Sequence, residues 1–159
     1  MNEKEAIEIG SEVLEQSVKT VGLGDTDIKK SKECRFTYLT QTDEDVDSEI
    51  RGRLNERTGV PILSEESNQI PESTDYWVVD PIDGTIPFAH SMPNYVTMLA
   101  FVSDGLPKAS VIHSPPTEHT FTATQETAYL NGTEIQSSDA VSVNEEAVFN
   151  SIRADGVHE

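Results

Sequence analysis

The chain has 159 residues, 35% of them hydrophobic, which suits one compact domain with a modest core. Its 29 acidic residues against 11 basic ones give a net charge of −18, so we expect no binding to nucleic acid or to an anionic membrane surface. No apolar run approaches the roughly 20 residues that span a bilayer. The first residues lack the apolar core of a signal peptide, which predicts a cytoplasmic protein. The single cysteine, Cys34, excludes an internal disulfide and a thiolate zinc cluster.

The first predicted element is an amphipathic helix over residues 2–20. Its apolar side chains fall close to one stripe of a 3.6-residue period, and they are Ile7, Val13, Leu14 and Val18. Gly22 and Gly24 end this helix, because glycine readily takes the left-handed conformation that closes helices. Residues 36–40 follow as a short extended piece rich in β-forming residues.

A second amphipathic helix is predicted from Thr42 to Gly59. Thr42 is its expected N-cap, and Asp45, three residues on, suits the free amides and the positive end of the helix dipole. The apolar residues then recur at i, i+4 spacing, at Val46, Ile50 and Leu54.

Short strands separated by turn residues are predicted in the next part of the chain. The continuous apolar run Tyr76–Val79 is typical of a buried strand. Further β-rich runs occupy Tyr95–Val102, Ala109–His113, Thr120–Thr124 and Thr127–Leu130. Asn131-Gly132 is predicted to be a type I′ hairpin turn. The pattern favours an α+β layered domain with two helices on a largely antiparallel sheet.

Candidate chemistry concentrates in residues 80–85, Asp-Pro-Ile-Asp-Gly-Thr, directly after the first apolar strand. Buried carboxylates are costly unless they are paired, hydrogen-bonded or bound to a cation. Oxygens of Asp80 and Asp83, with the Ile82 carbonyl, could converge on one hard cation such as magnesium. A capped turn, with Asp83 as N-cap and Asp80 as an Asx-turn residue, explains the same residues. The composition of this segment leaves both interpretations open.

The order of the acidic segments resembles the inositol monophosphatase family of magnesium-dependent, lithium-sensitive phosphatases. Besides residues 80–85, the resemblance rests on Leu39–Asp43, Ser64–Ser67 and Trp77–Val79, and on Phe88-Ala89-His90, Pro93 and Ala128–Gly132. It runs from about Lys32 to Ile135. The superfamily also includes fructose-1,6-bisphosphatases and 3′-phosphoadenosine-nucleotide phosphatases.

The resemblance implies a role for each matched residue. Implied metal ligands are Glu65, Asp80, Asp83 and the Ile82 carbonyl, with Glu66 as a neighbouring support. Glu65, Thr85 and Asp43 are the implied catalytic residues, with Thr85 and Asp43 orienting the attacking water. The amides of Gly84 and Thr85 are implied to receive the phosphate, and Lys32 to approach the active-site loop. The implied activity is magnesium-dependent hydrolysis of an inositol phosphate, fructose-1,6-bisphosphate or a phosphoadenosine nucleotide.

Two departures from the family pattern qualify this expectation. Ile86-Pro87 stands where the family has a small polar pair, and Pro87 lacks an amide donor. Family members also have a C-terminal α/β domain with a tryptophan-aspartate motif, whereas the only tryptophan here is Trp77. We therefore expect residues 1–159 to form the N-terminal domain of a layered sandwich of the sugar-phosphatase type, with the C-terminal domain absent from this chain.

Two further expectations follow from a missing C-terminal domain. The sheet face left by that domain would be apolar and would favour a homo-oligomer or other association. A non-catalytic, truncated metal-binding or interaction module is the alternative to a phosphatase. Histidine ligands are not expected in either case, because the four histidines share no metal-ligand spacing; they are His90, His113, His119 and His158.

Overall fold

A computed structural model of the chain describes residues 1–23, 41–65, 67 and 70–137. The elements in this part are, in chain order, α1 (Glu3–Val21), α2 (Gln41–Thr58), β1 (Ile62–Ser64), β2 (Asp75–Asp83), α3 (Thr85–Ala89), β3 (Val96–Ser103), β4 (Leu106–Ser114), β5 (His119–Thr124), β6 (Ala128–Leu130) and β7 (Thr133–Ile135). The predicted α+β fold is confirmed. The extended piece predicted at residues 36–40 lies outside the described residues.

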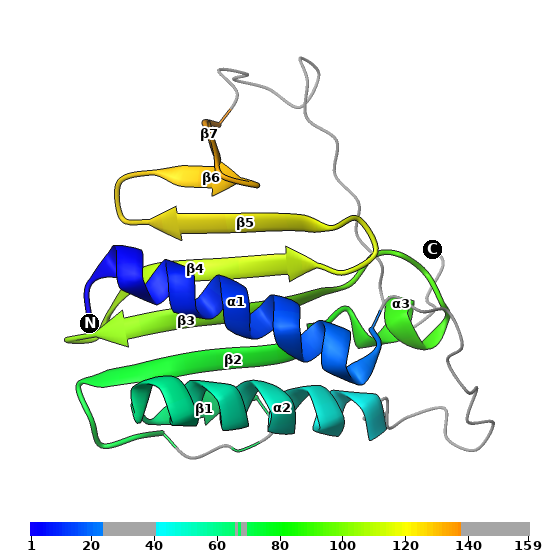
Figure 1. The fold of residues 1–159 in the computed structure, drawn as a ribbon, viewed down its shortest axis with the longest axis horizontal. Helices are drawn as coiled ribbons and strands as arrows, with labels where there is room; N and C mark the ends of the chain where they lie inside the picture. Colours follow the sequence, from blue (N-terminus) through cyan, green and yellow to red (C-terminus); the bar gives the residue numbers. More distant parts are fainter. Residues whose placement is uncertain (24–40, 66, 68–69, 138–159) are drawn as a thin grey trace, which may run out of the picture.

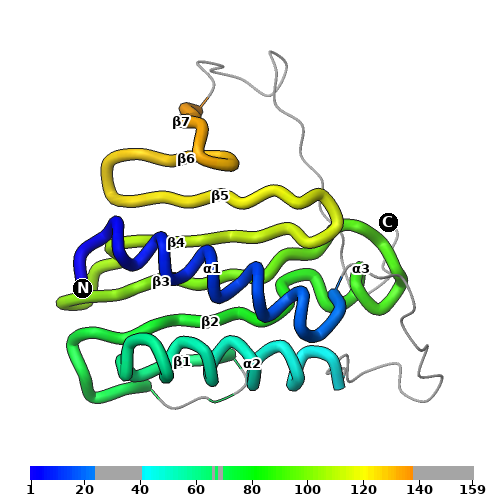
Figure 2. The backbone as a smooth tube through the Cα atoms, in the orientation of Figure 1, coloured from blue at the N-terminus to red at the C-terminus, as the bar shows by residue number. Residues whose placement is uncertain are grey.

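The described strands form one sheet in sequence order, from β1 at one edge to β7 at the other (Figures 1 and 2). Only β1 and β2 pair in parallel; every later pair is antiparallel. The predicted type I′ turn is confirmed, because both of its central residues have positive φ, 49° at Asn131 and 78° at Gly132. Short turns join the strands from β3 to β7, which explains why these consecutive strands are also neighbours in space.

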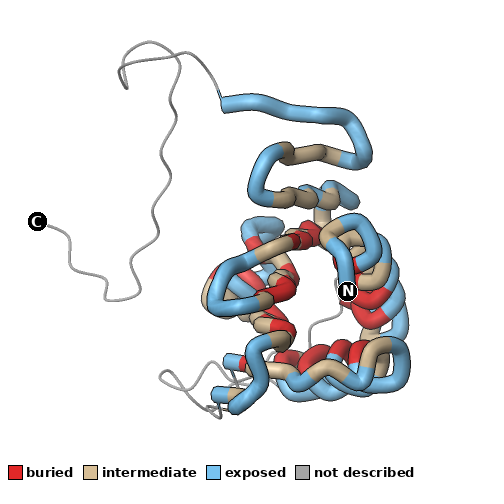
Figure 3. Tube along the Cα trace, turned by 90° about the vertical axis from the view of Figure 1, so that its left-hand side faces the viewer, coloured by how far each residue is buried: buried red, intermediate tan, exposed pale blue. Residues whose placement is uncertain are grey.

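Helices α1 and α2 run antiparallel to each other across one face of the sheet (Figure 1). Figure 3, turned by 90°, shows the buried residues gathered between these helices and the strands. The largest fully buried side chains include Trp77 and Phe101, whose rings lie 5.3 Å apart, and Leu14, Ile50 and Leu54 from the two helices. The predicted helix stripes therefore do face the core, except that Ile7 packs only at its margin.

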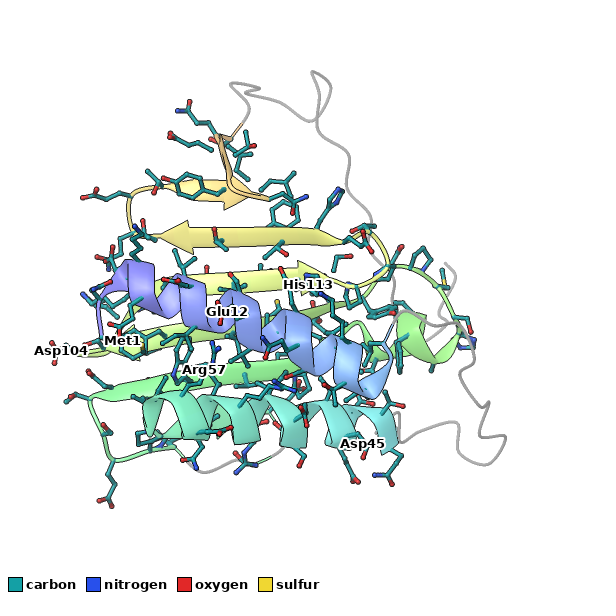
Figure 4. All side chains as sticks on the ribbon, viewed as in Figure 1. Met1, Glu12, Asp45, Arg57, Asp104 and His113 are labelled. Atoms are coloured by element: carbon teal, nitrogen blue, oxygen red, sulfur yellow. The ribbon has the colours of Figure 1, made fainter. Side chains whose placement is uncertain are left out.

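Polar contacts also join the two helices. Arg57 of α2 forms an ion pair with Glu12 of α1, and Figure 4 labels both side chains. Arg53, one turn earlier, donates to Gln16 Oε1 at 2.6 Å and to Thr20 Oγ1 at 3.1 Å. These bonds cross the solvent side of the helix pair, so they add to the apolar contacts beneath.

The ends of the helices follow the predicted signals with one exception. Asn2 and Glu5 form a capping box at the start of α1, and Gly22 closes it with φ 79°. Gly59 follows α2 with φ 61°. The expected N-cap at Thr42 is wrong, because α2 already begins at Gln41 and Thr42 lies inside its first turn. None of the described helices has the length and apolarity needed to cross a membrane.

The opposite face of the sheet is covered by no helix of the described part (Figure 3). Strand alternation and the pairing register place on it Val78, Met98, Ala100, Ile112, Phe121 and Leu130. All six are half-buried except Phe121, which is exposed. Association through this face remains a prediction.

Gly10 allows α1 to lie directly on the sheet. A Cβ atom at this position would lie 2.9 Å from Leu99 Cδ1 and 3.1 Å from Val111 Cγ2. We expect Gly10→Val to lower the free energy of unfolding by about 2 kcal/mol, since overpacking a dense core typically costs 1–3 kcal/mol. Urea unfolding measures the change. Gly52→Val is the matched control, because Gly52 is also helical and has nothing within 4 Å of its Cβ position. Equal effects of the two substitutions would contradict this packing.

Candidate active site

Three chain segments that carry the predicted acidic residues meet at the carboxyl ends of β1 and β2. Because β1 and β2 are parallel, their carboxyl ends lie together. Helix α2 runs over β1 and β2 in the opposite direction, so its first turn lies near the carboxyl ends of these strands (Figure 1). The amide of Glu65 donates to the Val79 carbonyl at 3.1 Å, which places Glu65 beside the residue before Asp80. Asp43, Glu65, Asp80 and Asp83 are thus brought to one region.

This arrangement of acidic groups raises the pKa of Asp80. Burial, followed by the negative charges of Glu65 and Asp83, raises the pKa of Asp80 from 3.8 to about 7. A side-chain hydrogen bond with Glu65 and the charge of Asp43 act in the same direction. Among the described residues, the buried Oδ1 atom of Asp80 has no hydrogen-bond partner. The site therefore holds more negative charge, and one more acceptor atom, than its own groups satisfy.

This donor set fits a hard divalent cation. Carboxylate and carbonyl oxygens are the ligands that magnesium prefers, and a cation would satisfy Oδ1 of Asp80 and relieve the repulsion around it. In the described part of the chain, no three Asp, Glu, His or Cys side chains are grouped closely enough to hold a metal as they stand. The Glu65 side chain is already hydrogen-bonded to Asp80, whereas the exposed Asp83 side chain would have to turn toward them for ligation.

The turn after β2 excludes one of the two sequence interpretations of this segment, the capped turn. Strand β2 does not stop at Val79 but continues to Asp83, paired with β3 through a register shift between Asp80 and Asp83. Such a bulge accommodates Pro81, which cannot donate to a regular ladder. The N-cap of α3 is Gly84, with φ 92°. The capped turn with Asp83 as N-cap is therefore wrong, and Asp80 is a strand residue.

Thr85 and Ile82 face each other across this turn. The Thr85 hydroxyl donates to the Ile82 carbonyl at 3.1 Å. The Ile82 carbonyl retains a second lone pair, so this bond leaves it able to accept another partner. Gly84 lies against the chain that follows α3, since a Cβ there would be 2.6 Å from the Asn94 carbonyl oxygen.

Asp43 lies in the first turn of α2 and is only 4% exposed. An acidic residue in a first helical turn is ordinarily solvated, and its burial here distinguishes it from its exposed neighbours Glu44 and Asp45. Lys32 and Glu66 lie outside the described residues.

Sequence reasoning missed two residues next to this region, Asp47 and Ser64. Asp47 is 6% exposed and Ser64 1% exposed, and the Ser64 hydroxyl donates to Asp47 Oδ1 at 2.5 Å. A signal was present in the sequence. Asp47 lies one turn after Asp43 and next to Val46, so it interrupts the apolar stripe of the helix with a charge.

A comparison with protein families shows which family the chain belongs to. Residues 2–159 match the model of the inositol monophosphatase family. The chain belongs to that family. The recognition from residues 39–43, 64–67 and 80–85 is thereby confirmed.

Relatives within the inositol monophosphatase family differ in the activities that their names state. A fructose-1,6-bisphosphatase/inositol-1-monophosphatase of Thermotoga maritima is 41% identical over 70 residues, which cover 43% of this chain and 27% of that protein. A 3′(2′),5′-bisphosphate nucleotidase of Aggregatibacter actinomycetemcomitans is 34% identical over 95 residues, covering 56% and 35% respectively.

A solved structure shows how much of the family fold the chain includes. The inositol monophosphatase of Thermotoga maritima superposes with a TM-score of 0.73 and 26% identity, over 85% of this chain and 54% of that one. The chain thus spans about half the length of this solved relative. Its layered α+β architecture is that of the inositol monophosphatase fold.

Proposed function

We propose that residues 1–159 form the N-terminal domain of a magnesium-dependent phosphatase of the inositol monophosphatase type, acting on a small phosphate monoester. The observation that carries the proposal is the gathering of Glu65, Asp83 and Asp43 around Asp80, whose buried Oδ1 atom has no hydrogen-bond partner among the described residues. Burial and the neighbouring negative charges raise the pKa of Asp80 to about 7. Family membership and the fit of the oxygen donors to a hard cation support the proposal.

The proposed roles divide between holding the metal and orienting the reactants. Glu65, Asp80, Asp83 and the Ile82 carbonyl would hold magnesium, which supplies Lewis-acid stabilisation of charge on a phosphoryl group. Asp43, nearly removed from water, would accept a hydrogen bond from the attacking water molecule. Thr85 would orient the same water through its hydroxyl, which lies at the start of α3. Phosphate binding by the Gly84 and Thr85 amides remains a prediction, as do the supporting roles of Glu66 and Lys32.

The proposed substrate class is a small phosphorylated metabolite. The relatives support this breadth, because their names state activity on a sugar bisphosphate, an inositol phosphate and a bisphosphate nucleotide. Assays of the full-length gene product against these three esters would identify the substrate. Metal binding without hydrolysis of any ester would instead support the non-catalytic metal-binding module.

Magnesium should stabilise the protein through Asp83. A ligand that binds only the folded state adds about 1.4–2.7 kcal/mol at ten to a hundred times its Kd, which corresponds to a rise in Tm of roughly 3–10 °C for a chain of this size. We expect 10 mM magnesium chloride to raise the Tm and Asp83→Asn to abolish that rise, because the exposed Asp83 side chain can be changed without opening the core. Calorimetry at pH 8 measures both.

The control variant is Asp104→Asn. Asp104 is an exposed aspartate in the turn between β3 and β4, and Figure 4 shows it at the opposite end of the molecule from Asp45 at the start of α2. It should keep the full magnesium response. If sodium chloride at matched ionic strength raised the Tm equally, and Asp83→Asn still responded, the proposed site would be refuted.

A further inference from the structure

Asp47 is a buried carboxylate whose place in α2 connects it to the candidate site. It lies four residues after Asp43, so the two side chains lie on the same face of the helix. Both are at least nine-tenths buried, with 4% of Asp43 and 6% of Asp47 exposed. Because a buried charge is costly unless it is satisfied, the partners of Asp47 show what it does in the fold.

Those partners join α2 to the end of β1. Oδ1 of Asp47 accepts the Ser64 hydroxyl at 2.5 Å, and Oδ2 pairs with Arg51 at 3.4 Å. Arg51 lies on the same helix and is 45% exposed, so its pair with Asp47 is partly screened by water. The bond to Ser64 is between elements and buried, and it is the stronger constraint.

Ser64 is the last residue of β1 and directly precedes Glu65. Its backbone is held by Ser67, whose hydroxyl accepts from the Ser64 amide at 3.2 Å and donates to the Ser64 carbonyl at 3.3 Å. On its other side, the Glu65 amide donates to the Val79 carbonyl of β2. The peptide that carries Glu65 is thus attached to β2 by its main chain and to α2 through Asp47.

We propose that Asp47 is a positioning residue: through the Ser64 hydroxyl it holds the start of α2 against the end of β1, and so fixes Asp43 relative to Glu65 and Asp80. This inference rests on the proposed function. The carboxylates that meet at Asp80 repel one another, and that repulsion acts to separate the start of α2 from the carboxyl ends of β1 and β2. The Asp47–Ser64 bond opposes the separation and keeps the oxygen donors at the spacing that a cation needs. Groups that orient metal ligands commonly change metal affinity 10- to 100-fold when removed.

Ser64→Ala is the decisive variant, because it removes the bond without changing any charge near the site. We expect it to raise the Kd for magnesium about tenfold, measured by isothermal titration calorimetry. Ser64→Thr restores a hydroxyl at the same position and should recover most of the affinity. Asp47→Ala, combined with Ser64→Ala, should weaken binding no further than the larger single effect, because each substitution removes one partner of the same hydrogen bond. If Ser64→Ala does not fold, Asp47→Ala alone carries the test, with an expected loss of several fold.

The matched control is Glu49→Gln. Glu49 also lies on α2 and also pairs with an arginine one turn on, Arg53, at 2.6 Å, but its partners do not include the end of β1. Its magnesium Kd should stay within about twofold of the unsubstituted protein, a shift of less than 0.4 kcal/mol.

The outcomes separate this inference from the proposed function. If Ser64→Ala lowers the Tm of the metal-free protein but leaves the Kd unchanged, the bond is only structural and the inference is overturned. If the unsubstituted protein shows no magnesium binding that depends on Asp83, there is no centre to position, and both proposals fail. Binding abolished by Asp83→Asn and weakened by Ser64→Ala, with Glu49→Gln unaffected, supports both.

Discussion

Gly84→Ala should destabilise the protein by about 3 kcal/mol or more. At φ 92° an alanine is strained, which by itself costs about 1–3 kcal/mol. The added Cβ would also lie 2.6 Å from the Asn94 carbonyl oxygen and 3.2 Å from Tyr95 Cα. Both neighbours are backbone atoms, so relief requires a shift of the chain between α3 and β3. Because that shift moves the turn carrying Asp83 and Thr85, magnesium binding should weaken as well.

The control for this prediction is Gly132→Ala. Gly132 has a similar positive φ of 78°, but nothing lies within 4 Å of its Cβ position. It should therefore show only the cost of the backbone conformation, about 1 kcal/mol. Urea unfolding of both variants separates strain from collision. Equal losses of stability would show that the Asn94 contact contributes nothing.

The metal-free protein should lose stability as the pH rises from 4 to 8. Asp80 binds a proton more tightly in the folded protein, where its pKa is about 7, than an ordinary aspartate with a pKa of 3.8. Between these values the folded state holds more protons than the unfolded state, so the free energy of unfolding falls with increasing pH. Three pKa units correspond to at most about 4 kcal/mol. Asp80 is only half-buried, so solvent screening reduces the expected loss to about 2 kcal/mol.

Asp80→Asn tests this assignment, because asparagine resembles the protonated carboxyl. In the presence of a chelator, the variant should be more stable than the unsubstituted protein at pH 8 by about 2 kcal/mol and should lack that part of the pH dependence. Chemical unfolding at pH 5 and pH 8 measures the difference. Asp104→Asn corrects for the general effect of removing one charge from a protein of net charge −18. If the stability of Asp80→Asn fell as steeply with rising pH as that of the unsubstituted protein, other groups would cause the pH dependence.

Local signals in the sequence were sufficient for most of the secondary structure. The stripe of Val46, Ile50 and Leu54 predicts a buried helix face because 3.6-residue periodicity depends only on nearby residues. Gly22 and Asn131-Gly132 likewise mark a helix end and a hairpin through their own backbone preferences. Thr42 is wrong as the N-cap, because it lies inside the helix at its second residue, and local signals locate helix boundaries only to within one or two residues.

The course of β2 shows the limit of local reasoning. Asp80 and Pro81 are poor strand residues, and their composition predicted an end to the strand at Val79. The antiparallel partner β3 nevertheless extends the pairing to Asp83, with an irregular register that tolerates the proline. The partner strand lies 13 or more residues away in sequence, so no window around Asp80 contains the deciding contact.

By itself, the sequence identified the family and its acidic segments, because motif spacing and residue type are preserved in the linear order. Only the tertiary structure showed that Asp43, Glu65 and Asp83 together raise the pKa of Asp80. It also showed that Asp47 joins α2 to β1 through Ser64. These contacts depend on the parallel pairing of β1 with β2 and on the reversed direction of α2. Strand direction and helix placement are set by burial of the whole core, with Trp77, Phe101 and Ile50 at its centre, and burial is a property of residues distant in sequence.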